Sequence, residues 1–346
     1  MPDPMDLGAY LDDWAQKDVN RADVAVAVIR ISEVCRQIAS LVARGPLAGA
    51  LGSETGRQSG VDPQKEVDVR ANDLIVNALK GTPVAALGSE ELEWALPINL
   101  NGTLAVAVDP IDGSSNIDAN VSIGTIFTVL PARASGADMS SFLQPGKAQL
   151  AAGFALYGPF TSLVLTVGQG THIFTLDRAT GRFLLTTRSV TIPPTTREYA
   201  INASNHRHWT ETIRTYIDDC LRGRDGPRTK DFNMRWTASP VADIFRILTR
   251  GGIFLYPGDQ RDGYAAGRLR LVYEANPFAW IIEQAGGAAS TGDDRILDVV
   301  PTSLHQRTPI MAGSKIEVEY VQRLHLEPLG VGERSPLFAR RGLFRT

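Results

Sequence analysis

Three short apolar segments of the chain each run directly into acidic residues. "VAALGSEE" ends in Glu90 and Glu91, "LAVAVDPIDGS" contains Asp109 and Asp112, and "LRLVYEANP" contains Glu274. Apolar runs of this length are typical of buried β-strands. Because open α/β folds place their ligands at the carboxyl ends of strands, we expect these carboxylates to share one site.

Segments with a helical pattern lie between the predicted strands. Apolar residues recur at helical spacing from about Asp23 to Leu41, and 68–81, "ETIRTYIDDCLRG", "VADIFRILTRGG" and "PFAWIIEQAGG" also read as helices. Interleaved strands and helices predict a layered α/β (α+β) protein. The Pro/Thr-rich stretch 191–196 predicts a boundary between an N-terminal α/β domain, 1–195, with the metal site, and a C-terminal α/β domain, 196–346.

Residues 44–63 form the most glycine-rich stretch, with five glycines and two prolines. So many glycines leave the backbone weakly restrained, so we expect a mobile loop. A plain connector and an active-site lid both fit this composition. The neighbouring acidic motifs favour the lid.

Composition narrows the function classes. The 346 residues include 35 Lys and Arg and 38 Asp and Glu, a net charge of -3, so neither nucleic acid nor a membrane surface is the expected partner. Cys35 and Cys220 are too few for a disulfide framework or a zinc cluster. "MPDPMD" lacks the basic start of a signal peptide, and the apolar run at 24–29 is too short to span a bilayer. A cytoplasmic protein is therefore expected.

Clustered carboxylates point to a hard divalent cation. Mg²⁺ takes oxygen ligands, usually a few carboxylates completed by water and substrate phosphate. Any single acidic pair is more often a solvated loop or a helix cap. Three acidic strand ends in one chain favour a metal site instead.

The stretch "DPIDGSSNID" at 109–118 combines a cation site with an anion site. Pro110 restricts the backbone between Asp109 and Asp112, so a turn can bring both carboxylates to one cation. The main-chain N–H groups of Gly113, Ser114 and Ser115 can then hold a phosphate. The alternative is an ordinary N-cap turn, and the two interpretations are compatible.

These motifs resemble the class I fructose-1,6-bisphosphatases. "DPIDGSSNID", "GSEE", "GGIFLYP" and "YEANP" carry the resemblance, which runs from about residue 10 to 325. The family belongs to the Mg²⁺-dependent, lithium-sensitive phosphatases that include inositol monophosphatases. The resemblance implies a five-layered α/β/α/β/α sugar-phosphatase fold, a homotetramer, and hydrolysis of the 1-phosphate of fructose 1,6-bisphosphate in gluconeogenesis or the Calvin cycle.

The resemblance also implies roles for individual residues near the 1-phosphate. Two or more Mg²⁺ ions per subunit, or Mn²⁺ or Zn²⁺ in their place, are expected on Glu90, Asp109, Asp112, Glu274 and the carbonyl of Ile111. Asp62 closes over them from the loop. Asp68 and Glu91 position and deprotonate the attacking water. Asp112 also contacts the substrate.

A second set of residues is implied for the 6-phosphate, namely Asn202, Arg235, Tyr256 and Arg268. Arg235 is expected to come from a neighbouring subunit, and Arg268 replaces the usual lysine. Trp236 replaces a tyrosine, so sedoheptulose 1,7-bisphosphate remains an alternative or second substrate. A non-catalytic regulatory homologue is a further alternative, which the complete set of acids disfavours.

Overall fold

The computed structural model describes residues 5–18, 20–59, 62–133 and 139–326, and leaves out the side chains of 57–59 and 62–63. Its α-helices are α1 (Leu7–Ala15), α2 (Asn20–Val42), α3 (Glu66–Leu79), α4 (Glu211–Leu221), α5 (Pro240–Arg250), α6 (Asn276–Gln284) and α7 (Lys315–Leu326). The helices predicted from apolar spacing are therefore confirmed, with ends that differ by a few residues.

The first half of the chain builds an eight-stranded sheet in the order β10-β9-β8-β7-β6-β5-β3-β4. Its strands are β3 (Val84–Ser89), β4 (Leu96–Pro97), β5 (Leu104–Asp112), β6 (Ile123–Pro131), β7 (Ala151–Tyr157), β8 (Thr161–Thr166), β9 (Thr171–Asp177) and β10 (Arg182–Thr187). Only the β3–β5 pair in this sheet is parallel. Every residue of β3 and β5 is buried, which explains their continuous apolar runs.

The second half builds a five-stranded sheet in the order β12-β11-β13-β17-β15. Its strands are β11 (Glu198–Ala200), β12 (Asn233–Met234), β13 (Ile253–Tyr256), β15 (Ala288–Ser290) and β17 (Ile310–Gly313). Two small antiparallel pairs complete the strands, β1 (Glu54–Ser59) with β2 (Asp62–Lys65) and β14 (Leu269–Arg270) with β16 (Arg307–Thr308).

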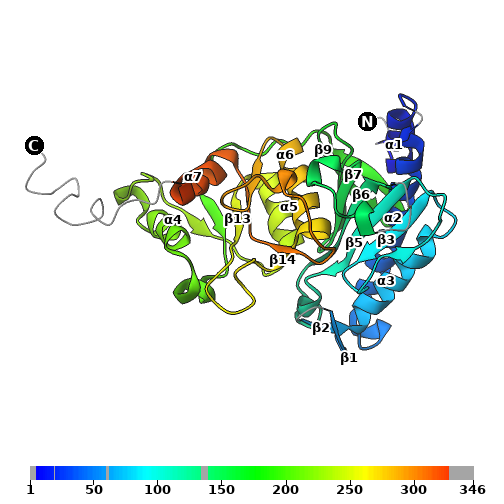
Figure 1. The fold of residues 1–346 in the computed structure, drawn as a ribbon, viewed down its shortest axis with the longest axis horizontal. Helices are drawn as coiled ribbons and strands as arrows, with labels where there is room; N and C mark the ends of the chain where they lie inside the picture. The colour runs from blue at the N-terminus through cyan, green and yellow to red at the C-terminus, as the bar shows by residue number, and fades with distance from the viewer. Residues whose placement is uncertain (1–4, 19, 60–61, 134–138, 327–346) are drawn as a thin grey trace, which may run out of the picture.

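The elements stack in five layers, from right to left in Figure 1. Helices α1 to α3 cover one face of the eight-stranded sheet, and α5 and α6 lie between the two sheets. Helices α4 and α7 cover the far face of the five-stranded sheet. Separate apolar clusters fill the spaces between these layers. The five-layered α/β/α/β/α fold implied by the resemblance is confirmed.

The strand predicted over "LRLVYEANP" is wrong for most of its length. Only Leu269 and Arg270 are extended, and a π-helical turn, η7 (Leu271–Ala275), leads directly into α6. Pro277 lies in the first turn of α6, directly after η7. Glu274 is therefore presented by a helical turn and not by a strand end.

The glycine-rich stretch 44–63 contains regular elements. It begins with a 3₁₀ turn, η1 (Gly45–Ala48), and continues into the β1–β2 hairpin, which projects beside the start of α3. Its mobility stays a prediction.

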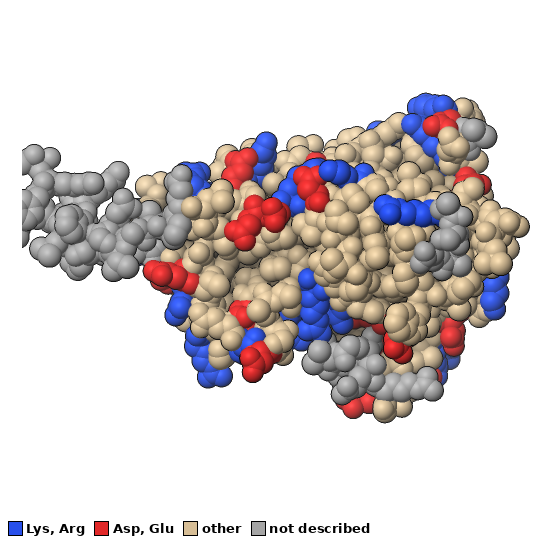
Figure 2. Space-filling model, in the orientation of Figure 1, with Lys and Arg blue, Asp and Glu red and all other residues tan. Residues whose placement is uncertain are grey.

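Opposite charges are interspersed on the molecular face in Figure 2, in keeping with the small net charge. A group of Lys and Arg side chains lies between β14 and β2, where the two halves of the molecule meet. Within the described part of the chain, every helix is too short or too polar to traverse a lipid bilayer.

A buried ion cluster fastens segment 228–230 to α7. Glu317 is fully buried and accepts hydrogen bonds from Arg228 at 2.5 Å, Lys230 at 3.0 Å and the Tyr216 hydroxyl at 3.0 Å. The Arg228 guanidinium also lies 4.2 Å from the ring centre of Tyr320. Removing the carboxylate leaves the cationic groups without their charge partner inside the protein.

We expect Glu317→Ala to lower the free energy of unfolding by about 3–5 kcal/mol, because Arg228 stays buried and unpaired. Urea denaturation measures the loss. Glu319→Ala on the same helix is the control, since Glu319 forms only an exposed pair with Lys315 at 3.9 Å and should cost less than about 1 kcal/mol. Equal losses in the two variants would contradict the prediction.

Candidate active site

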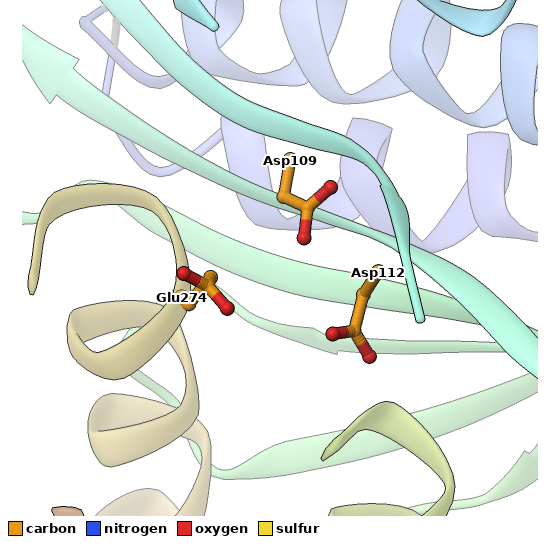
Figure 3. Close-up of side chains that lie close together, drawn as sticks. All are labelled: Asp109, Asp112 and Glu274. Atoms are coloured by element: carbon orange, nitrogen blue, oxygen red, sulfur yellow. The ribbon is translucent and has the colours of Figure 1, made fainter. Parts of the chain in front are cut away.

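Three buried carboxylates form the centre of the site. Asp109 and Asp112 lie at the end of β5, and Glu274 lies on η7. One oxygen from each can be chosen so that all three lie within 4.8 Å of one another. Figure 3 shows the three side chains converging from the strand and the helical turn. A divalent cation with oxygen ligands fits this donor set.

A strand irregularity lets both aspartates face the same point. Residues three apart in a regular strand point to opposite faces of the sheet. The β5–β6 register shifts between Asp109 and Asp112, and the Ile111 N–H turns back to Asp109 Oδ1 at 3.0 Å. The Pro110 carbonyl accepts a hydrogen bond from Thr125 Oγ1 at 2.7 Å. This bulge gives the two carboxylates a common direction.

Backbone donors hold the other carboxylate oxygens. The Val241 N–H, in the first turn of α5, donates to Asp112 Oδ2 at 2.9 Å. The Arg270 N–H donates to Glu274 Oε2 at 2.5 Å. Asp112 and Glu274 are thus both oriented by backbone groups from the C-terminal half of the chain.

Burial makes the carboxylate cluster electrostatically costly. Burial is the main cause that raises the pKa of Asp112 from 3.8 to about 7; the Val241 hydrogen bond opposes it, and the charge of Glu90 adds to it. Burial and the charge of Glu90 also raise the pKa values of Asp109 and Glu274 well above their ordinary range. Such a cluster ionises readily only beside a positive charge.

Arg270 supplies part of that charge. Its side chain is buried, and its guanidinium lies 3.4 Å from Glu90 Oε1. Burial opposes the charged form of Arg270, but Glu274 and Glu90 outweigh it and raise the pKa. One guanidinium cannot neutralise Glu90 together with the three central carboxylates, so the site keeps a negative excess.

Asp68 lies at the start of α3 and faces the same cavity. Its Oδ2 accepts from the Lys65 N–H at 2.7 Å, and its Oδ1 is also buried. Burial is the main cause that raises its pKa to about 7; the Lys65 hydrogen bond works against it, and the charges of Glu91 and Glu90 add to it. A carboxyl group of this pKa can exchange a proton at neutral pH.

The predicted residues gather around one cavity of about 320 Å³. It is lined by Asp68, Glu90, Glu91, Asp109, Ile111, Asp112, Gly113, Ser114, Ser115, Asn202, Tyr256, Arg268 and Glu274. Arg235 does not line it; its side chain is 56% exposed and its Nε lies 3.7 Å from Glu198. The side chain of Asp62 lies outside the described part of the structure.

The turn after Asp112 is tied to the opposite half of the molecule. Gly113 adopts a φ of 76°, a conformation that a residue with a side chain adopts only under strain. A 3₁₀ helix, η2 (Ser114–Ala119), follows, and the Asn116 side chain donates to the Ala238 carbonyl at 2.8 Å. Asn116 thus links the turn to the segment before α5.

Sequence reasoning missed several contributors. Arg270 precedes Glu274 by four residues in "RLRLVYE", and this spacing could have suggested an ion pair. Lys65 and Pro240 also line the cavity, and Gln64 hydrogen-bonds Glu91. These contacts join distant segments, so no local pattern signals them.

A larger cavity of about 760 Å³ lies beside the site, between the end of α2, residues 43–53 and residues 117–123. Asp118 is the only acidic residue among the described residues that line it. The smaller cavity is therefore the better candidate for metal-dependent chemistry.

Comparison with known proteins agrees with this geometry. Family models described as "Fructose-1-6-bisphosphatase, N-terminal domain" and "Fructose-1-6-bisphosphatase, C-terminal domain" match residues 10–188 and 192–326. "Fructose-1,6-bisphosphatase class 1" of Rhizobium meliloti (strain 1021) is 54% identical over 98% of both chains. The protein of that name from Azorhizobium caulinodans is 56% identical over 91% of this chain and 97% of its own. The crystal structure of Leishmania major fructose-1,6-bisphosphatase in holo form superposes with a TM-score of 0.85 at 36% identity, covering 92% of this chain and 98% of that one.

The raised pKa values predict how the metal-free protein responds to pH. Asp68 and Asp112 have an ordinary pKa of 3.8 in the unfolded chain and about 7 in the folded chain, so the folded chain binds more protons between these values. Their contribution to stability is therefore fully present below about pH 4 and is lost as the pH rises through about 7.

In EDTA at pH 8, we expect the free energy of unfolding of Asp112→Asn to exceed that of the wild type by on the order of 2 kcal/mol, so the variant unfolds at a higher temperature, and we expect the difference to shrink at pH 5. Thermal melts of both proteins across this range isolate Asp112 from other titrating groups. Adding MgCl₂ should stabilise the wild type more at pH 8 than at pH 5, because carboxylates bind the cation in their ionised form. A metal-free variant less stable than the wild type at pH 8 would contradict the prediction.

Proposed function

Because the chain belongs to the class 1 fructose-1,6-bisphosphatase family, we propose that the carboxylates around Asp109 hold the cations with which it works. The chain is an enzyme of this family and hydrolyses fructose 1,6-bisphosphate to fructose 6-phosphate and phosphate. The observation that carries the proposal is the convergence of Asp109, Asp112 and Glu274 beside a cavity lined by polar and cationic groups.

The donor set fits magnesium. All the acidic groups offer hard oxygen atoms, and their raised pKa values mark a site that gains from a cation. We assign Glu90, Asp109, Asp112, Glu274 and the Ile111 carbonyl as ligands of two or more Mg²⁺ ions, with Mn²⁺ or Zn²⁺ as substitutes. When bound, these cations polarise the 1-phosphate, lower the pKa of water and neutralise charge on the leaving oxygen.

The chain's own groups supply positioning and proton transfer. Asp68 and Glu91 orient the attacking water and accept its proton. The main-chain N–H groups of Gly113, Ser114 and Ser115 hold the phosphate that reacts. Since phosphoryl transfer passes through a loose transition state, such positioning and charge compensation account for most of the catalysis.

The cavity also carries groups suited to a second phosphate. Arg268, Tyr256 and Asn202 line it, and the Arg268 guanidinium lies 4.9 Å from the ring centre of Tyr264. Arginine binds phosphate through two parallel hydrogen bonds, so it can replace lysine here. We assign these residues to the 6-phosphate. Trp236, which stands where the family resemblance implies a tyrosine, also lines the cavity. We therefore propose sedoheptulose 1,7-bisphosphate as an alternative substrate.

We also propose a cytoplasmic location and a role in gluconeogenesis or the Calvin cycle. Both cysteines, Cys35 and Cys220, are free and buried, which fits a reducing compartment.

Phosphate release from fructose 1,6-bisphosphate should require Mg²⁺ and be inhibited by lithium. We expect Asp112→Asn to lower the rate roughly 100-fold or more, because it removes a charged cation ligand. Asp225→Asn, a change at an exposed aspartate far along the chain, is the control and should retain full activity. Unchanged activity of Asp112→Asn would refute the assignment of the site.

A comparison of phosphate release from the two sugar bisphosphates tests the substrate. Equal rates with sedoheptulose 1,7-bisphosphate would favour the alternative substrate.

We further propose that Arg235 completes the 6-phosphate site of a neighbouring subunit in a homotetramer. Its exposed side chain, its absence from the cavity lining and its place beside the edge strand β12 support this. Arg235→Ala should raise KM roughly tenfold, because a charge-assisted phosphate contact is lost.

Mixing subunits tests whether Arg235 acts across an interface. Co-assembled Arg235→Ala and Asp112→Asn subunits should regain activity at low substrate, since the second subunit supplies Arg235 to the intact metal site of the first. Subunits carrying both changes, mixed with Arg235→Ala, are the control. If mixed oligomers are shown to form and activity at low substrate does not recover, Arg235 acts within its own subunit.

A further inference from the structure

The position of the Glu91 carboxylate depends on contacts outside the cavity. Glu91 follows β3, lines the cavity, and is one of the two groups to which the proposed function assigns the attacking water. A glutamate side chain has several rotatable bonds, and holding it in one rotamer is entropically unfavourable. A base that must meet one water molecule therefore needs partners that fix its direction.

Gln64 on β2 contacts this carboxylate. Its side-chain amide donates from Nε2 to Glu91 Oε2 at 2.5 Å. Its other end, Oε1, accepts from Thr55 Oγ1 on β1 at 3.0 Å. Gln64 is 8% exposed and does not line the cavity, so it contacts the Glu91 carboxylate without facing the cavity itself. The amide is thus engaged at both ends, and the hairpin strands β1 and β2 share in holding Glu91.

The backbone of Glu91 is held from a different direction. Its N–H donates to Ser89 Oγ at 3.3 Å, and Ser89 Oγ donates to Asn72 Oδ1 at 2.8 Å. Asn72 lies one turn after Asp68 on α3, and both Asn72 and Ser89 are buried. This chain fixes the end of β3 against the helix that carries Asp68. The backbone is therefore placed by α3, and the carboxylate is oriented by the hairpin.

A neutral donor is chemically suited to this task. An amide N–H can orient a carboxylate without adding a positive charge, whereas a lysine or arginine would make the carboxylate a weaker base. The amide also has no proton to give up at neutral pH, so Gln64 stays an uncharged donor.

We infer that Gln64 is a positioning residue for Glu91: its amide sets the direction of the carboxylate that, under the proposed function, helps activate the attacking water. The competing explanation is that this hydrogen bond only fastens the hairpin to β3. The two explanations differ in kinetics. Positioning affects the rate of the bound substrate, so kcat falls while KM for fructose 1,6-bisphosphate stays within about twofold.

The experiment is a double-mutant cycle on the full-length protein with saturating Mg²⁺. Gln64→Met keeps the length of the buried side chain and removes both hydrogen bonds. We expect it to lower kcat roughly 10- to 100-fold in the wild-type background but less than about threefold in the Glu91→Gln background, because its effect passes through Glu91. Glu54→Gln, at an exposed position of the same hairpin, is the matched control and should leave kcat unchanged.

Two results would overturn the inference: a kcat within twofold of the wild type, or equal losses in both backgrounds. Thermal melts accompany the kinetics, and if Gln64→Met does not fold, Gln64→Asn replaces it, because it keeps an amide but withdraws it by one methylene. If the wild type is active and the Gln64 variant is unaffected, the positioning role of Gln64 is refuted and the proposed function is not. A wild type that releases no phosphate from fructose 1,6-bisphosphate refutes the proposed function and this inference with it.

Discussion

Mutual repulsion among buried carboxylates is the constraint on which the site depends. Asp109, Asp112 and Glu274 are removed from water, where the same charges would interact weakly. The fold assembles them by two local departures from regular structure, the bulge at the end of β5 and the π-helical turn η7, and by the hydrogen bond from the start of α5 to Asp112. The unfavourable free energy of this arrangement becomes affinity for cations, since a metal relieves the repulsion that folding creates.

The same arrangement places the site at the junction of the two sheets. Asp112 at the end of β5 is held by α5, and Asn116 in the following turn is held by the Ala238 carbonyl. Arg270, from the C-terminal half, pairs with Glu90 at the end of β3. Every link crosses between segments more than one hundred residues apart in the chain. A small shift of one sheet against the other would therefore change the spacing of the carboxylates.

Local patterns predicted the elements but not the long-range contacts. The apolar runs before Glu90 and Asp109 located β3 and β5 because buried strands leave a continuous signal. Glu274 was expected at a strand end, yet it lies on η7, because the extended run ends at Arg270 and a helical turn begins at Leu271. The Val241–Asp112 hydrogen bond joins segments that the sequence separates, so only the folded structure reveals it. Roles taken from the family resemblance, such as that of Asp62, stay predictions.

Two neighbouring glutamates at the site, Glu90 and Glu91, have side-chain partners of different charge. Glu90 and Glu274 face the guanidinium and the backbone of Arg270, which lowers the negative excess that the cations must balance. Glu91 meets the neutral amide of Gln64 instead. A cation ligand tolerates a neighbouring positive charge, because the metal itself fixes its ionised state. A proton acceptor does not, because the same charge would weaken it as a base. Glu90 thus contacts a cationic side chain, and Glu91, the next residue, contacts a neutral one.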